Sequence, residues 1–181
     1  MKKVIGLLSI SILLISSACS KKGSKVSTND ASSNPNEEVV NKPTEEVKAE
    51  EVPTEIHWMT IEEAARAVEK EPRKIMVDVY TSWCGPCKLL DKKTFHNKKV
   101  VEYVSKNFYA VKFDAEGKTP ITFKGKTFKN PSRTHEFTYH LGVTGYPTVA
   151  FFDENLNLET RTVGFYDAPE FLKALKKIQP N

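Results

Sequence analysis

An apolar run that ends at two closely spaced cysteines constrains the fold of this chain more than any other feature. Residues 74–80 (KIMVDVY) are nearly all apolar, which is typical of a strand buried on both faces of a sheet. Cys84 and Cys87 follow where a helix is expected to begin, so free N–H groups and the helix dipole favour a thiolate. We expect Cys84, the more exposed position, to be the attacking sulfur and Cys87 the resolving one. Within a βαβ pattern, a Cys-x-x-Cys at this junction indicates a redox-active pair.

The surrounding residues predict a single α/β domain over residues 56–181. Capping-box signatures stand at Thr60 with Glu63 and at Asp167 with Glu170. Residues 121–123 and 127–128 predict a small β-hairpin with a glycine-containing turn. The apolar periodicity predicts strands at 56–58, 73–80, 109–114, 149–153 and 159–164, and helices at 61–71, 84–95, 100–108, 135–141 and 168–178.

Asp78 lies inside the apolar strand that leads to the cysteines. A carboxylate there is costly to bury, so we expect desolvation to raise its pKa. Such an acid near Cys87 could accept and return the proton that thiol exchange moves. The alternative is a solvated aspartate at the end of the strand, with no part in the chemistry.

Two motifs together resemble the thioredoxin family: residues 83–88 (WCGPCK) and residues 145–148 (GYPT) before an apolar strand. The resemblance implies a thioredoxin-like α/β/α sandwich with a central mixed sheet, to which this chain adds the small hairpin. It also implies a cis proline in the second motif, in a loop that offers its backbone to an extended substrate. The site residues that it implies are the catalytic Cys84, Cys87 and Asp78, the supporting Trp83, Gly85 and Pro86, and the substrate-binding Tyr146, Pro147 and Thr148.

The helix after the cysteines departs from the thioredoxin pattern. Thioredoxins carry a kinking proline five residues past the second cysteine, where this chain has Lys92. A break after Phe95 and the acidic Asp91 are similar to the C-terminal periplasmic domain of DsbD, a transmembrane disulfide reductant. The resemblance adds Asp91 and Lys112 as supporting residues, since thioredoxins place a lysine beside their buried carboxylate. By residue type alone, Lys112 is typical of a surface lysine and Asp91 of a solvated helix charge.

Residues 117–134 are an insertion relative to a minimal thioredoxin and contain basic residues but no acidic ones. One interpretation is an edge hairpin whose lysines prevent strand-to-strand aggregation. The other is a docking surface for an acidic partner. The net charge of the whole chain, +4, favours neither a nucleic-acid partner nor a strongly acidic substrate. The basic residues are Lys118, Lys124, Lys126, Lys129 and Arg133.

The N-terminus is typical of a secreted lipoprotein. Residues 1–18 combine two lysines, an apolar run and small residues, as a lipoprotein signal peptide does. We expect Cys19 to be the lipidated residue, although Ser16 stands where that pattern prefers an aliphatic side chain. The alternative is an ordinary cleaved signal with Cys19 as a spare thiol. Residues 19–55 are polar and predict a disordered, lipid-anchored linker spanning about 30–36 Å.

The sequence therefore predicts an extracytoplasmic protein-disulfide oxidoreductase, lipid-anchored to a bacterial membrane, that reduces protein disulfides. We expect it to be a monomer that exchanges electrons with protein thiols and disulfides and receives them from a membrane donor of the DsbD type. We expect no organic cofactor and, because the histidines are scattered, no metal. The alternatives are a disulfide oxidase or isomerase on the same scaffold, or a redox-inert module that binds unfolded peptide.

Overall fold

The computed structural model of the protein describes residues 53–180, which include a five-stranded mixed sheet. The strands lie in the order β1-β3-β2-β6-β7, with β3 parallel to both β1 and β2, while β6 runs antiparallel to β2 and β7. This confirms the expected thioredoxin-like fold with a separate two-stranded hairpin. The strands of the sheet are β1 (Trp58–Met59), β2 (Lys74–Tyr80), β3 (Phe108–Asp114), β6 (Thr148–Phe152) and β7 (Leu158–Val163).

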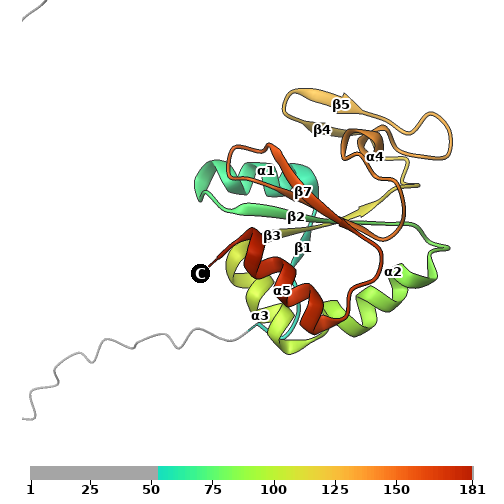
Figure 1. Cartoon of the computed structure of the whole chain (residues 1–181). Helices are drawn as coiled ribbons and strands as arrows, with labels where there is room; N and C mark the ends of the chain where they lie inside the picture. The colour runs from blue at the N-terminus through green and yellow to red at the C-terminus, as the bar shows by residue number, and fades with distance from the viewer. Residues whose placement is uncertain (1–52, 181) are drawn as a thin grey trace, which may run out of the picture. The chain divides into compact units, whose positions relative to one another are not determined.

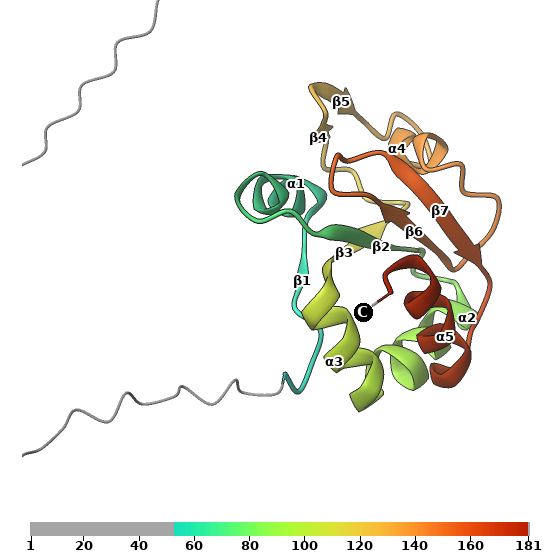
Figure 2. The same cartoon turned by 60° about the vertical axis from the view of Figure 1, so that its left-hand side comes forward.

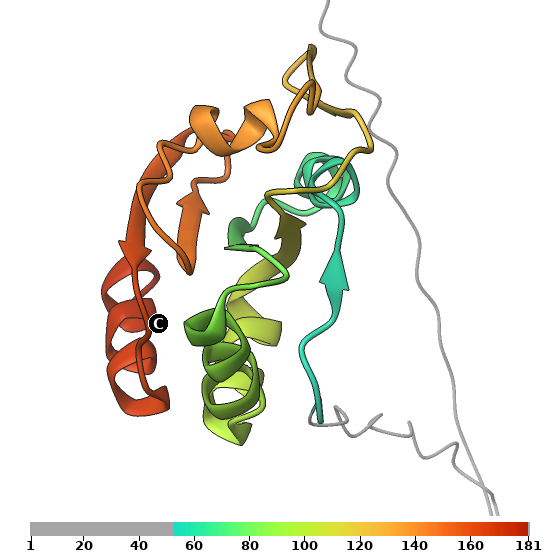
Figure 3. The same cartoon turned by 90° about the vertical axis from the view of Figure 1, so that its right-hand side faces the viewer.

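Helices cover both faces of this sheet (Figures 1 and 2). On one face lie α2, η1, α3 and α5, and on the other lie α1, α4 and the β4–β5 hairpin. Figure 3 shows the strands between these two layers. The bounds are α1 (Ile61–Lys70), α2 (Gly85–Leu90), η1 (Asp91–Phe95), α3 (Lys98–Asn107), β4 (Ile121–Phe123), β5 (Lys126–Phe128), α4 (Glu136–His140) and α5 (Ala168–Ile178).

The alternation of side chains along β2 divides the interior into two hydrophobic cores. Ile75, Val77 and Val79 point into the core that contains α1, the hairpin and α4. Met76 points into the core beneath α2, α3 and α5. Because side chains alternate, Asp78 faces the same side as Met76, which is the side that carries the helix of the two cysteines.

The helix predicted over residues 84–95 is regular only as far as Leu90. The next five residues, Asp91–Phe95, form the π-helix η1. No proline stands at position 92 to remove a backbone donor, so the helical hydrogen bonding continues through Lys92. The predicted break after Phe95 is confirmed, since Asn97 caps α3 by accepting the backbone N–H of Lys99 at 3.1 Å.

The first strand also differs from the prediction. It comprises Trp58–Met59 instead of residues 56–58, and Ile56 is buried in the core ahead of it. The N-terminal assignments, including the signal peptide at 1–18 and the linker with Cys19 at 19–55, fall almost entirely outside the described residues. Within residues 53–180, no helix is both long and apolar enough to cross a lipid bilayer.

Candidate functional site

The two motif cysteines form a disulfide at the start of α2. Their sulfurs are 2.06 Å apart, and Cys84 occupies the N-cap position. The Cys84 sulfur accepts the backbone N–H of Cys87 at 3.1 Å. In the reduced protein a donor in this position favours a thiolate at Cys84. Gly85 and Pro86 are exposed and form the first turn, where proline sacrifices no helical hydrogen bond.

The prediction that Cys84 is the more exposed cysteine is wrong for this disulfide form. Cys84 exposes 3% of its surface and Cys87 exposes 7%. The Cys84 sulfur accepts a hydrogen bond at the N-terminus of the helix, whereas Cys87 lines a cavity of about 220 Å³ together with Asp78 and Lys112. The surface-facing neighbour of Cys84 is Trp83, which is 67% exposed.

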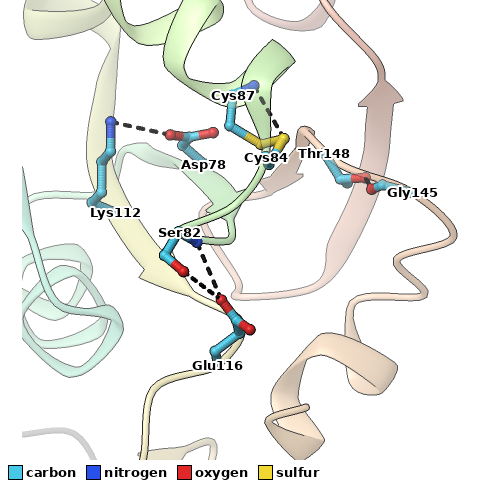
Figure 4. The surroundings of a disulfide bond; sticks show 8 residues. All are labelled: Asp78, Ser82, Cys84, Cys87, Lys112, Glu116, Gly145 and Thr148. Carbon is cyan, nitrogen blue, oxygen red and sulfur yellow. Dashed lines mark hydrogen bonds and ion pairs between the residues drawn. A yellow bond between two sulfur atoms is a disulfide. The ribbon is translucent and has the colours of Figure 1, made fainter. Parts of the chain in front are cut away.

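Asp78 is buried beneath α2, and Figure 4 shows its carboxylate between Lys112 and the two cysteines. Oδ2 of Asp78 lies 3.3 Å from Nζ of Lys112. Burial raises the pKa of Asp78 to about 6, and the positive charge of Lys112 opposes this rise. The other oxygen, Oδ1, has no hydrogen-bond partner among the described residues. The carboxyl group can therefore bind or release a proton near neutral pH, in the cavity that also reaches Cys87.

Lys112 is not an isolated surface lysine, because it binds two carboxylates. It forms ion pairs with Asp78 and with Asp91 of η1, and its ammonium lies 4.7 Å from the ring centroid of Trp58. The pairing of β2 with β3 explains this position, since Lys112 stands directly opposite Asp78 in the register. Asp91 lies close enough that its negative charge adds to the rise in the pKa of Asp78.

The second motif lies beside the disulfide, and its Tyr146–Pro147 peptide is cis, as the resemblance implied. Thr148 is buried and donates its hydroxyl hydrogen to the carbonyl of Gly145 at 2.7 Å, which holds the loop together (Figure 4). The ring of Tyr146 packs edge to face on Trp83, with the centroids 5.9 Å apart. The loop and the cysteine motif therefore share one aromatic surface.

Glu116 was not predicted to belong to the site, yet it anchors the loop before the cysteines. Its carboxylate accepts the backbone N–H of Ser82 at 3.2 Å and the Ser82 hydroxyl at 3.1 Å (Figure 4). It also accepts the indole N–H of Trp83 at 3.1 Å. The hydrogen bond from the Ser82 backbone is the main reason that the pKa of Glu116 lies below its usual range. The strand register carries the missed signal. Tyr80 and Asp114 are partners at the ends of β2 and β3, so Ser82 and Glu116, which lie two positions beyond them, are neighbours.

Of the residues predicted for the site, the structure brings together Asp78, Asp91, Lys112 and the two cysteines, with Tyr146–Thr148 beside them. Cys19 lies outside the described residues. Within residues 53–180, no group of three or more His, Cys, Asp or Glu side chains is placed to hold a metal ion.

Residues 61–179 match the family of thioredoxin-like domains. The thiol:disulfide interchange protein DsbD of Haemophilus ducreyi is 31% identical to this chain over 108 residues, which are 59% of this chain and 17% of DsbD. DsbD of Escherichia coli strain K12 is 28% identical over 124 residues, which are 67% of this chain and 20% of that protein. The chain thus spans about a fifth of the length of these curated relatives.

Solved structures show the same fold. A Thermus thermophilus thioredoxin aligns with a TM-score of 0.53 at 21% identity, over 68% of this chain and 86% of its own. A Bacteroides thetaiotaomicron protein assigned as a candidate disulphide isomerase aligns with a TM-score of 0.53 at 31% identity, over 71% of this chain and 97% of its own. With the domain match and the Cys84–Cys87 disulfide, the chain belongs to the thioredoxin-like family of thiol–disulfide oxidoreductases.

Proposed function

We propose that this protein reduces protein disulfides outside the cytoplasm through the Cys84–Cys87 pair. The observation that carries the thiol–disulfide exchange in this proposal is the buried Asp78, which lines one cavity with Cys87 and whose pKa of about 6 suits proton exchange near neutral pH. A carboxyl group placed at random on a surface would show neither the burial nor the raised pKa.

The reaction begins with the reduced protein. The Cys84 thiolate attacks one sulfur of a substrate disulfide, forming a mixed disulfide, and the other substrate sulfur leaves as a thiolate and takes a proton from water. Cys87 then passes its proton to Asp78 and attacks the Cys84 sulfur, which releases the second substrate sulfur as a thiolate. That thiolate is protonated in turn. Two electrons pass to the substrate, and the protein is left as the disulfide seen in the structure.

Two observations favour reduction over oxidation. The residues between the cysteines are Gly85 and Pro86, the pair found in thioredoxin, whose potential is about −270 mV against about −120 mV for the oxidant DsbA. The curated relatives named above are DsbD proteins. The π-helix that contains Asp91 stands where thioredoxins have a helix kinked by proline. We therefore propose a membrane donor of the DsbD type as the source of the two electrons.

The proposed location rests on the N-terminal sequence. Residues 1–18 would be the signal peptide, Cys19 the lipidated residue, and residues 19–55 the linker between the membrane and a thioredoxin-like domain at 56–181. The similarity to DsbD supports an extracytoplasmic site. In cells that express a Cys19→Ser variant, the protein should move from the membrane fraction to the soluble fraction. If it stays membrane-bound after washing in high salt, the lipid anchor is excluded.

Disulfide isomerisation is the second candidate function. The Bacteroides thetaiotaomicron protein assigned to that activity is 31% identical and is matched over nearly its whole length. Isomerases operate near −180 mV, well above the thioredoxin value. The potential of the Cys84–Cys87 couple therefore separates the two candidates.

Equilibration with glutathione buffers, followed by thiol alkylation, measures this potential. We expect a value near −270 mV, and a value above about −180 mV would contradict the reductase proposal. Reduction of insulin, with Cys84→Ser as the inactive control, separates both redox functions from a redox-inert peptide-binding module. Equal insulin reduction by the parent protein and by Cys84→Ser would exclude redox activity.

A further inference from the structure

A groove of about 650 Å³ lies beside the redox site and has no part in the proton transfer described above. One wall belongs to the cysteine motif and to the cis-proline loop, and the other belongs to the insertion at 117–134. The lining residues are Thr81, Trp83, Glu116, Lys118, Ser132, Arg133, Thr134 and Tyr146.

The insertion gives this groove two positive charges. Lys118 and Arg133 are exposed, and neither forms an ion pair with any residue between 53 and 180. The ammonium of Lys118 donates to the carbonyl of Ser132, which holds the two ends of the insertion together but leaves the charge in place. Glu116 is the one acidic residue of the lining. Its carboxylate accepts three hydrogen bonds from Ser82 and Trp83, and the charge of Lys118 helps to lower its pKa, so the lining as a whole keeps a net charge of +1.

The opposite wall fixes where an occupant would lie relative to the sulfurs. Trp83 directly precedes Cys84, and Tyr146 directly precedes Pro147. A chain that extends along the cis-proline loop with its cysteine at Cys84 advances about 3.3 Å per residue, so a residue close to that cysteine falls within this groove. The aromatic wall can contact the backbone and apolar side chains of such a chain, while Lys118 and Arg133 attract a carboxylate.

We propose that this groove selects substrate polypeptides that carry an acidic side chain next to the reactive cysteine. This inference rests on the proposed thiol–disulfide exchange and names the substrate class that it favours. It assigns Lys118 and Arg133 as specificity-determining residues and gives the basic insertion a function in docking. Charge complementarity of this kind favours encounter with the right partner more than it adds affinity.

The test uses two ten-residue peptides, each closed by one disulfide, that differ only at the positions flanking the cysteines. One peptide has Glu at these positions and the other has Gln. The full-length protein is reduced and freed of reductant, and its single-turnover oxidation by each peptide is followed through tryptophan fluorescence, to which Trp83, the neighbour of Cys84, and Trp58 both contribute. The variants are Lys118→Gln/Arg133→Gln and, as a control with the same change of charge outside the groove lining, Lys126→Gln/Lys129→Gln.

The parent protein should react faster with the Glu peptide than with the Gln peptide by roughly 2-fold to 30-fold, the range expected for two exposed ion pairs. The ratio should fall towards one in the groove variant and in about 0.5 M salt, where the Debye length is only a few ångströms, and should persist in the control variant. A ratio of one in the parent protein, or an equal loss in both variants, would overturn the inference. So would a dependence of the ratio on protein concentration, which would assign the groove to a second copy of the chain.

The same experiment distinguishes a failure of the proposed thiol–disulfide exchange from a failure of the proposed selectivity. If the protein reduces neither peptide faster than Cys84→Ser does, the proposed thiol–disulfide exchange fails. If it reduces both at the same rate, only the proposed selectivity fails.

Discussion

Replacing Asp78 with asparagine should make the oxidised protein more stable at neutral pH. In the folded protein, burial raises the pKa of Asp78 from 3.8 to about 6. Each unit of difference between the folded and unfolded states corresponds to about 1.36 kcal/mol, so ionised Asp78 costs the folded state about 3 kcal/mol. Asparagine has nearly the same shape but carries no charge, so the variant avoids this cost.

The raised pKa also determines the direction in which stability changes with pH. Because the pKa is higher in the folded chain, the folded state keeps a proton that the unfolded state has already lost. The contribution of Asp78 to stability is therefore greatest below pH 4 and falls as the pH rises through about 6. The amide of the Asp78→Asn variant does not titrate, so the difference between the variant and the parent should grow by about 2 kcal/mol between pH 4 and pH 7.5.

Urea unfolding of both oxidised proteins at several pH values measures this difference. Equal stabilities at pH 7.5, or a difference that does not change between pH 4 and pH 7.5, would refute the argument that Asp78 is buried with a raised pKa. The same variant should also react more slowly in thiol exchange, and its pH–rate profile should lack the inflection near pH 6.

Two further substitutions test other contacts. Lys112→Met removes the positive charge that opposes the rise in the pKa of Asp78. The inflection of the pH–rate profile should therefore move above pH 6. The control substitution Lys99→Met, on the exposed side of α3, should leave the inflection unchanged. An inflection that stays in place in Lys112→Met would contradict the ion pair. Thr60→Ala removes a side chain that accepts the N–H of Glu63 at 3.2 Å, and should lower the free energy of unfolding by about 1 kcal/mol. Identical urea midpoints for the parent and Thr60→Ala would contradict a capping role.

The sequence predicted those parts of the site that depend on local patterns. The apolar residues of β2 around Asp78 made its burial and raised pKa foreseeable, and both are confirmed. The cis Tyr146–Pro147 peptide was foreseeable only from the family resemblance, because an isolated X–Pro bond is cis in about 5–6% of cases in folded proteins.

The features that the sequence did not predict depend on contacts between distant segments. Residue type alone indicated an ordinary surface lysine at Lys112, and only the family resemblance placed it beside Asp78, because that position comes from the β2–β3 register, which no local pattern reveals. Glu116 was missed for the same reason. The low exposed fraction of Cys84 arises only in the folded chain, and the π-helix at Asp91–Phe95 has no distinctive composition. Each of these was a question of tertiary placement, beyond what residue type could indicate.

The division of the interior into two cores has an evolutionary consequence. Asp78 and the helix of the cysteines lie on the side of the sheet with α3 and α5, whereas the hairpin of the insertion and α4 are rooted in the core on the other side. The insertion can therefore lengthen, shorten or change its charge without repacking the residues that surround the buried acid. Selection can then adapt the same electron-transfer chemistry to new client proteins through changes in one peripheral segment.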